Sequence, residues 1–242
     1  TMINLAKKID IFKPTVDAVV KGNPKSLLLV EFAEENMDEN HRRLNKLHQL
    51  MGDLGYSWKR GMKKGGVVDV IDSNLQSKVS EMRKSGLNIM MSMKDDAKPV
   101  SFIEDCAVEL KDLAEYTDGL NKIFDKYNVK GTWYAHASVG CLHVRPVLNM
   151  KIQDDVDKMR NIATETSSLV KKFKGSYSGE HGDGIARSEF NEVMFGKKMT
   201  NIFKSIKNSF DPLNIFNPGK IVDAPKLDER DYFRYAPSYN AK

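Results

Sequence analysis

The residues best suited to chemistry lie in the segment SGEHGDG at positions 178–184. An acid, Glu180, and an imidazole, His181, stand side by side there between three glycines. Because glycine tolerates positive φ values and lets a flat ligand approach the backbone, the segment predicts a tightly turned loop. Such a loop could present Glu180 as a metal ligand and His181 as a proton acceptor. The alternative is that Glu180 only caps or orients the loop.

Two further histidines, His136 and His143, lie in the segment HASVGCLH. If residues 139–140 form the two-residue turn of a β-hairpin, His136 lies directly opposite His143, with Cβ atoms about 4.5–5.5 Å apart. Two imidazoles at that spacing could share one metal ion, or each could simply bond to backbone or water. With Glu180 they make a His, His, carboxylate set, a common ligand set for a divalent metal that leaves positions open for substrate.

His181 adjoins Glu180, so in an extended segment its ring must point in another direction. An imidazole close to a metal could take the proton of a substrate alcohol, because the metal lowers the pKa of that alcohol. The sequence therefore predicts His181 as the base of a proton transfer.

Three cations are candidates for binding a carboxylate: Arg83, Lys98 and Arg145. Arginine offers a planar fork of donors and lysine offers a second point charge. Arg145 follows His143 by two residues, so on a strand both side chains share one face. Taken alone, Arg83 and Lys98 have the ordinary alternative of being solvated surface cations.

The elements that position these residues follow from the spacing of apolar side chains. Helices are expected at 36–54, 76–85, 110–127, 154–173, 188–195 and 197–210. Strands are expected at 26–33, 87–93, 99–105, 131–135 and 141–148, with a loop or weak strand at 61–69. The adjacent strands at 131–135 and 141–148 favour antiparallel pairing. The predicted fold class is therefore α+β, with an antiparallel sheet covered by helices and further helices toward the C-terminus.

Composition restricts the class of protein. The 38 basic residues are mixed with 33 acidic ones, so the net charge of +5 forms no dense basic block and nucleic-acid binding is not expected. Two cysteines are too few for a disulfide framework, which favours a reducing, cytoplasmic compartment. No apolar run is long enough for a transmembrane helix. Residues 1–26 read as a connector or cut edge, 27–222 as the main domain and 223–242 as an extended linker.

Three segments together resemble the C-terminal, substrate-cap region of the FAD-linked oxidases of the vanillyl-alcohol oxidase and p-cresol methylhydroxylase superfamily. They are HASVGCLHVRPVLNM at 136–150, SGEHGDGIARSEF at 178–190, and the stretch 194–222 that ends FDPLNIFNPGKIV. The superfamily includes glycolate oxidase subunits, D-lactate dehydrogenases and D-2-hydroxyglutarate dehydrogenases. The resemblance implies a ferredoxin-like cap fold and the oxidation of a 2-hydroxy acid at its α-carbon, with hydride passing to FAD.

Position by position, the resemblance also implies roles for residues of this chain. They are the ligands of a Zn or Mn ion (His136, His143 and Glu180), the base (His181), the carboxylate ligands (Arg83 and Lys98) and part of the flavin contact (Asn217 and Lys220). Many relatives read H-x-G-D-G-N-x-H at the histidine pair, whereas the interior here is Ala-Ser-Val-Gly-Cys-Leu.

The resemblance further implies partners outside these 242 residues. A flavin-binding domain of the same protein is expected to hold most of the FAD, so the chain alone is expected to be inactive. Residues 222–239 resemble the large bacterial members in which an iron–sulfur domain follows, and an electron acceptor could bring the protein to a membrane surface. Homo-oligomerisation stays open. So do two other functions: a non-catalytic binding or assembly module with the same fold, and a metal hydrolase with the same His-His-Glu ligands.

Overall fold

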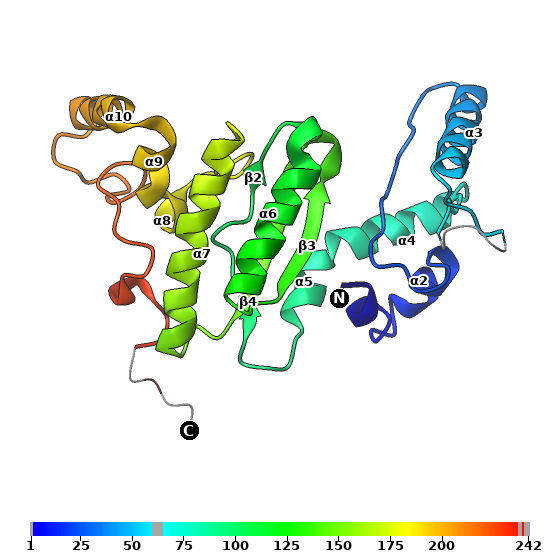
Figure 1. Ribbon diagram of the computed structural model, residues 1–242, viewed down its shortest axis with the longest axis horizontal. Coiled ribbons are helices and arrows are strands. Elements are labelled where there is room, and N and C mark those ends of the chain that lie inside the picture. Colours follow the sequence, from blue (N-terminus) through cyan, green and yellow to red (C-terminus); the bar gives the residue numbers. More distant parts are fainter. Residues whose placement is uncertain (1, 60–64, 237–238, 240–242) are drawn as a thin grey trace. The chain divides into compact units, whose positions relative to one another are not determined.

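The computed structural model describes residues 2–59, 65–236 and 239 (Figure 1). The chain divides into two compact units, Thr1–Met90 and Met91–Lys242. Among the described residues the four strands all belong to the second unit and pair in antiparallel fashion, while helices occur in both units. The predicted α+β fold class is confirmed. No helix in the described ranges has both the length and the hydropathy needed to cross a bilayer.

The sheet of the second unit is built around β4 (Cys141–Leu148). β3 (Gly131–His136) forms a hairpin with β4. Two short strands, β1 (Lys98–Pro99) and β2 (Cys106–Ala107), pair with opposite ends of β4. The two strands that the sequence predicts for this hairpin are confirmed.

The strand predicted at 99–105 is interrupted, which corrects the expectation. After β1 the backbone leaves the ladder in a bend and a turn, and Asp105 adopts a positive φ of 80°. Phe102 and Ile103 are buried in the core because of this turn. The same turn also buries two acids, Glu104 and Asp105.

Two long helices, α6 (Leu113–Lys126) and α7 (Gln153–Lys172), lie side by side and cover one face of the sheet (Figure 1). The even-numbered residues of β4, such as Val144, point toward these helices and are buried with them. The helix residues of this core include Tyr116, Leu120, Phe124, Val156, Ile162 and Val170. Because successive side chains of a strand alternate, the odd-numbered residues of β4 lie on the other face.

Three further helices of the described residues complete the second unit. They are α8 (Gly184–Arg187), α9 (Asn191–Phe195) and α10 (Lys197–Phe210). Single 3-10 turns occur at η1 (Leu110–Asp112), η2 (Ala137–Val139), η3 (Ser188–Phe190) and η4 (Arg230–Tyr232). The helices predicted from residue 110 onward are all confirmed, with the first turns at 110–112 and 188–190 in 3-10 form.

The first unit is helical: α1 (Met2–Ala6), α2 (Lys13–Val19), α3 (Met37–Asp53), α4 (Ser73–Lys84) and α5 (Gly86–Met91), whose last residue is the first of the second unit. The helices predicted at 36–54 and 76–85 are confirmed as α3 and α4. Residues 2–20, part of the predicted connector or cut edge at 1–26, contain two helices that pack on a small core with Val16 and Ile89. The domain boundaries stay predictions.

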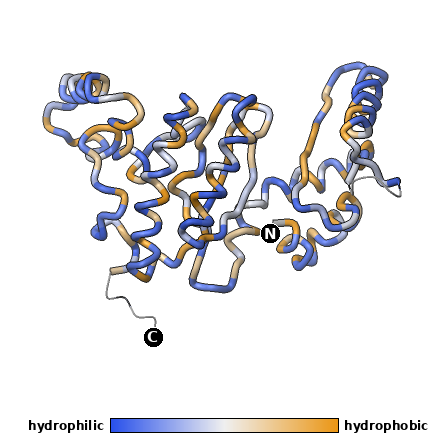
Figure 2. Tube along the Cα trace, viewed as in Figure 1, coloured by the Kyte–Doolittle hydropathy of each residue, from blue (hydrophilic) through white to orange (hydrophobic). Residues whose placement is uncertain are grey.

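Two predicted strands of the first half are wrong. Residues 87–93 were expected as a strand and form helix α5 instead, because a short apolar run has no period that separates a buried helix from a strand. Residues 26–33 are extended but pair with no strand among the described residues, and Leu28 is 80% exposed. Figure 2 shows this stretch as an orange segment leading to α3. An apolar segment forms a β-strand only where another strand pairs with it through backbone hydrogen bonds.

Two predictions fall partly on residues that the structure does not describe. The loop or weak strand expected at 61–69 has its first four residues there. The extended linker expected at 223–242 has positions 237–238 and 240–242 there.

Candidate metal and proton-transfer site

The hairpin brings the first two candidate histidines onto one face of the sheet. His136 lies opposite Cys141, and His143 lies opposite Tyr134, so the predicted pairing of His136 with His143 is wrong. The connection contains a 3-10 turn ending at Gly140, whose φ is 70°, rather than a two-residue turn. The two histidines are instead diagonal neighbours, and their ring centroids are 5.0 Å apart. They remain close enough to share a ligand.

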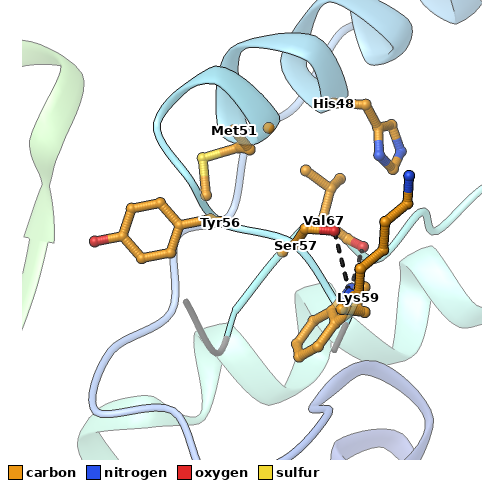
Figure 3. A pocket seen from close by; sticks show the side chains of 9 residues that line it. His48, Met51, Tyr56, Ser57, Lys59 and Val67 are labelled. Atoms are coloured by element: carbon orange, nitrogen blue, oxygen red, sulfur yellow. Dashed lines mark hydrogen bonds between the residues drawn. The ribbon is translucent and has the colours of Figure 1, made fainter. Parts of the chain in front are cut away.

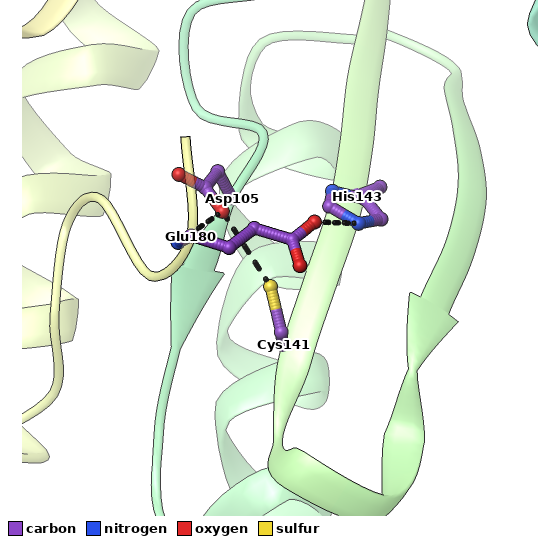
Figure 4. Close-up of side chains that lie close together, drawn as sticks. All are labelled: Asp105, Cys141, His143 and Glu180. Carbon is purple, nitrogen blue, oxygen red and sulfur yellow. Dashed lines mark hydrogen bonds and ion pairs between the residues drawn. The ribbon is translucent and has the colours of Figure 1, made fainter. Parts of the chain in front are cut away.

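Glu180 reaches this face from the glycine-rich loop between α7 and α8. Its Oε1 lies 2.9 Å from Nε2 of His143 and 3.7 Å from Nε2 of His136. The same oxygen lies 3.2 Å from Nε2 of His181. Figure 4 shows the Glu180 carboxylate pointing toward the His143 ring. One oxygen of the Glu180 carboxylate therefore lies within 3.7 Å of a ring nitrogen of each of three histidines.

The environment of His143 favours its neutral form. The side chain is buried, and this burial lowers its pKa, with the nearby His136 and His181 acting in the same direction and Glu180 opposing them. Its Nδ1 is buried and has no hydrogen-bond partner among the described residues. A neutral imidazole has a lone pair, which a metal ion can use.

Glu180, His136 and His181 face solvent more than His143 does. Their side chains are 41%, 39% and 46% exposed, so a small molecule can reach the group. The ring of His181 stacks on that of His143, with centroids 5.3 Å apart and planes 9° apart. The site therefore combines the buried imidazole of His143 with three side chains that solvent can reach, those of Glu180, His136 and His181.

Asp105 holds the loop that carries Glu180 and His181, and sequence reasoning missed it. It is fully buried, and its two carboxylate oxygens accept hydrogen bonds from the backbone N–H groups of Glu180 and His181, both at 2.9 Å. Burial alone would raise the pKa of Asp105, but these two hydrogen bonds and one from Ser178 outweigh it and lower the pKa. The carboxylate is therefore held ionised beneath the loop.

Arg145 lies on the site face, as predicted, but its charge is already matched. Its Nε donates to a carboxylate oxygen of Glu104 in an ion pair that is about nine-tenths buried. The other oxygen of Glu104 lies 4.0 Å from Nδ1 of His181. Glu104 is thus a second acid near the predicted base that the sequence reading did not single out.

Cys141 provides an additional sulfur beside the carboxylates. Burial, with the charges of Asp105 and Glu180, raises the pKa of this thiol to about 12, and the thiol donates to Asp105 at 3.7 Å. Ligand atoms of Asp105, Cys141, His143 and Glu180 all lie within 4.8 Å of one another (Figure 4). Because the Asp105 oxygens are occupied by backbone amides, the two histidines and Glu180 are the groups better placed to hold a metal.

Lys98, a predicted cation of the same unit, does not lie at this cluster. Lys98 lies opposite Leu148 in the sheet, on the face away from His143, and its Nζ donates to the carbonyl of Met93. Arg83 is exposed in the last turn of α4, in the first unit.

Asn217 and Lys220 lie beyond the end of α10. Asn217 is exposed with a φ of 47°, and Lys220 is half-buried and donates to the carbonyl of Pro218. Their roles, like those of Lys98 and Arg83, stay predictions.

A separate pocket of about 230 Å³ lies in the first unit (Figure 3). Its lining includes His48, Tyr56 and Trp58, and the indole of Trp58 donates to the carbonyl of Val67. His48 is paired with Asp69 at 2.9 Å. None of the candidate site residues lines this pocket.

Comparison with known proteins identifies the family. The model for the C-terminal domain of FAD-linked oxidases matches residues 2–221, and the chain therefore belongs to this family. A D-2-hydroxyglutarate dehydrogenase of Haemophilus influenzae is 31% identical over 245 aligned residues, which cover 95% of this chain and 22% of that protein. The glycolate oxidase subunit GlcD of Bacillus subtilis is 28% identical over 66% of this chain and 34% of its own. A D-lactate dehydrogenase of Archaeoglobus fulgidus is 31% identical over 52% of this chain and 27% of its own.

These comparisons confirm the family resemblance and place the chain in a family of FAD-linked oxidoreductases. The chain spans 22% of the length of three D-2-hydroxyglutarate dehydrogenases that it matches.

Proposed function

We propose that this chain is the substrate-binding and catalytic region of a FAD-dependent dehydrogenase of a 2-hydroxy acid. The relatives named for D-2-hydroxyglutarate, D-lactate and glycolate all act on acids with a hydroxyl group beside a carboxylate. Such a substrate needs a group that activates the hydroxyl, a base for its proton and a cation for its carboxylate. The convergence of three imidazoles on one oxygen of Glu180 is the observation that carries the proposal.

His136, His143 and Glu180 are the proposed ligands of a divalent metal ion, Zn or Mn. Imidazole and carboxylate donors suit both ions, and three protein ligands leave a coordination position for substrate. The lowered pKa of His143 and the 2.9 Å approach of its Nε2 to the Glu180 carboxylate support this fit. When bound, the ion would polarise the substrate hydroxyl and lower its pKa.

His181 is the proposed base for the hydroxyl proton. Its Nε2 lies next to the Glu180 oxygen, and its half-exposed ring can exchange a proton with solvent. The carboxylates of Glu104 and Asp105 lie 4.0 Å and 3.9 Å from its Nδ1. Negative charges at this distance stabilise the imidazolium that forms when His181 takes the proton.

The proposed contacts to the substrate carboxylate and to the flavin use cations and polar groups. Arg145 is the candidate on the site face, although its pairing with Glu104 reduces its net attraction for an anion. Arg83 and Lys98 stay proposed contributors to carboxylate binding on the family resemblance, although Lys98 lies on the sheet face away from His143. Asn217 and Lys220 are proposed to contact FAD, which would accept the hydride and which a separate domain of a longer protein would mainly hold. An iron–sulfur domain beyond residue 242 is part of the same proposal.

The test is turnover of the protein with its flavin-binding domain after the change His181→Ala. Removal of a general base costs about 10²- to 10⁴-fold in rate, so turnover of 2-hydroxy acids should fall by that factor while bound flavin stays at the wild-type level. His48→Ala is the matched control, because His48 is a similarly exposed histidine that pairs with Asp69 in the first unit. Undiminished turnover in His181→Ala would remove the assignment of the base.

A further inference from the structure

We propose that Asp105 is the positioning residue of this site and sets where Glu180 and His181 lie. The inference rests on the proposed function, because it concerns the same metal ligand and base. Asp105 acts through these two residues rather than on substrate.

The first argument is the pattern of hydrogen bonds. The two oxygens of Asp105 accept from two consecutive amides, those of Glu180 and His181, at 2.9 Å each. The carbonyl of Asp105 accepts from the amide of Gly179 at 2.7 Å. Three successive backbone N–H groups of the loop therefore end on one residue. Asp105 is fully buried, so a shift of the loop would leave its oxygens without these donors, and an unsatisfied buried acceptor costs free energy.

The second argument is that both ends of the loop are tied to the same carboxylate. Ser178 donates its hydroxyl to Asp105 at 3.1 Å and accepts from the amide of Gly182 at 2.9 Å. Arg187, at the end of α8, donates to Asp105 at 3.1 Å and to the carbonyl of Glu104 at 2.8 Å. The loop is thus closed around Asp105 from its first residue to the helix that follows it.

The third argument is steric. Asp105 has a positive φ of 80°, a conformation that costs free energy for a residue other than glycine. A Cβ atom on Gly179 would lie 2.9 Å from the Asp105 carbonyl oxygen. A side chain at position 179 would therefore clash with the backbone of Asp105. The positive φ of Asp105 and the absence of a side chain at Gly179 together allow this close approach.

The consequence concerns the distance between the loop and the strand. His143 belongs to β4, whereas Glu180 reaches it only from the loop that Asp105 holds. Loosening the loop would separate Glu180 from His143 while leaving the sheet in place. Groups that orient metal ligands contribute about 10- to 100-fold in metal affinity, and Asp105 should contribute an amount in that range.

Asp211 provides a matched control in the same unit. It is also buried, and its two oxygens accept from the consecutive amides of Ile215 and Phe216, again at 2.9 Å each. A cation, Lys207, pairs with it as Arg187 pairs with Asp105. The loop that it holds carries none of the proposed metal ligands.

The experiment is calorimetric titration of the purified protein with Zn²⁺ alone. Asp105→Asn keeps the size of the side chain but places an NH₂ group against a backbone N–H. We expect Zn²⁺ affinity to fall about 10- to 100-fold in this variant. Asp211→Asn should keep wild-type affinity although it loses equivalent hydrogen bonds. Hydrogen exchange at the amides of Glu180 and His181 should become faster in Asp105→Asn only.

Three outcomes would overturn the inference. The first is a folded Asp105→Asn variant with wild-type Zn²⁺ affinity. The second is an equal loss of affinity in Asp211→Asn, because the effect would then be general destabilisation. If Asp105→Asn does not fold, Ser178→Ala decides: a several-fold loss of affinity supports the inference and an unchanged affinity contradicts it. Absence of Zn²⁺ binding in the wild type would instead contradict the proposed metal site itself.

Discussion

Asp105 and Asp211 each capture two consecutive backbone amides, yet the loops that they hold differ in what they present. The loop on Asp105 directs Glu180 and His181 toward histidines of β3 and β4. The loop on Asp211 follows α10 and exposes apolar side chains, among them Phe216 at 70%. The same hydrogen-bond chemistry therefore stabilises a turn in both places. Only the loop on Asp105 also fixes the distance between a carboxylate, that of Glu180, and an imidazole, that of His143.

The largest expected effect comes from changing the side chain that the Asp105 loop carries. Glu180→Gln removes the negative charge and one strong ligand, so Zn²⁺ affinity should fall by more than about 100-fold, beyond the loss expected for a residue that only orients a ligand. The matched change is Ile215→Ala, since the amide of Ile215 bonds Asp211 as that of Glu180 bonds Asp105. It should leave affinity unchanged. Equal affinities for all three proteins in a Zn²⁺ titration would contradict the comparison.

A second change tests the role of Glu104, the buried acid that precedes Asp105 in the sequence. Glu104→Gln leaves Arg145 without its buried partner, and breaking such a pair costs about 3–5 kcal/mol in the free energy of unfolding. Glu109→Gln breaks an exposed pair with Lys111 and should leave the free energy of unfolding close to the wild-type value. Urea denaturation measures both. A Glu104→Gln variant as stable as Glu109→Gln would mean that the pair with Arg145 does not hold the turn.

A third change disturbs the Asp105 loop without touching a carboxylate. Gly179→Ala places a methyl group 2.9 Å from the Asp105 carbonyl oxygen, so the loop must move, at a cost of about 1–3 kcal/mol. Zn²⁺ affinity should fall with it. Gly52→Ala is the control, because nothing lies within 4 Å of the new methyl group in α3 and alanine favours a helix by about 1 kcal/mol. Thermal unfolding and Zn²⁺ titration of both variants test this, and a Gly179→Ala protein with wild-type values would contradict the tight approach.

The smallest expected effect is on stability in acid, where Asp105 and Asp211 should behave alike. Both have a pKa below the usual 3.8, Asp105 because hydrogen bonds outweigh its burial and Asp211 because of Lys207. A lowered folded-state pKa contributes stability that is present above pH 3.8 and is lost as the pH falls through the folded value. Either Asn variant should therefore show a shallower loss of stability in acid than the wild type. Urea midpoints between about pH 5 and pH 2 measure this, and an unchanged slope in both variants would contradict it.

The site residues of the hairpin and the glycine-rich loop could be predicted from the sequence because their chemistry is local. Glu180 beside His181, and two histidines in a strand pattern, are visible as residue types at short spacing. The exact register of the hairpin could not be predicted, because η2 replaces the expected two-residue turn. His136 is therefore a diagonal neighbour of His143 and does not lie directly opposite it. Both histidines stayed on one face because a strand alternates with period two.

The residues that the sequence did not reveal act through tertiary contacts. Asp105 and Glu104 end a segment that reads as an ordinary strand, and nothing nearby in sequence indicates amides 75 and 76 residues away. Two acids directly after a buried apolar run were the available signal. The failures in the first half have a similar cause, because neither the exposed stretch at 26–33 nor helix α5 is specified by its own apolar pattern.

The central claim is that His136, His143 and Glu180 bind one divalent metal ion. Anomalous diffraction at the zinc absorption edge from crystals grown with Zn²⁺ tests it most directly. The account predicts one peak about 2.0–2.2 Å from Nε2 of both histidines and from a carboxylate oxygen of Glu180. A zinc peak elsewhere, for example between His48 and Asp69, with none at this position would contradict it.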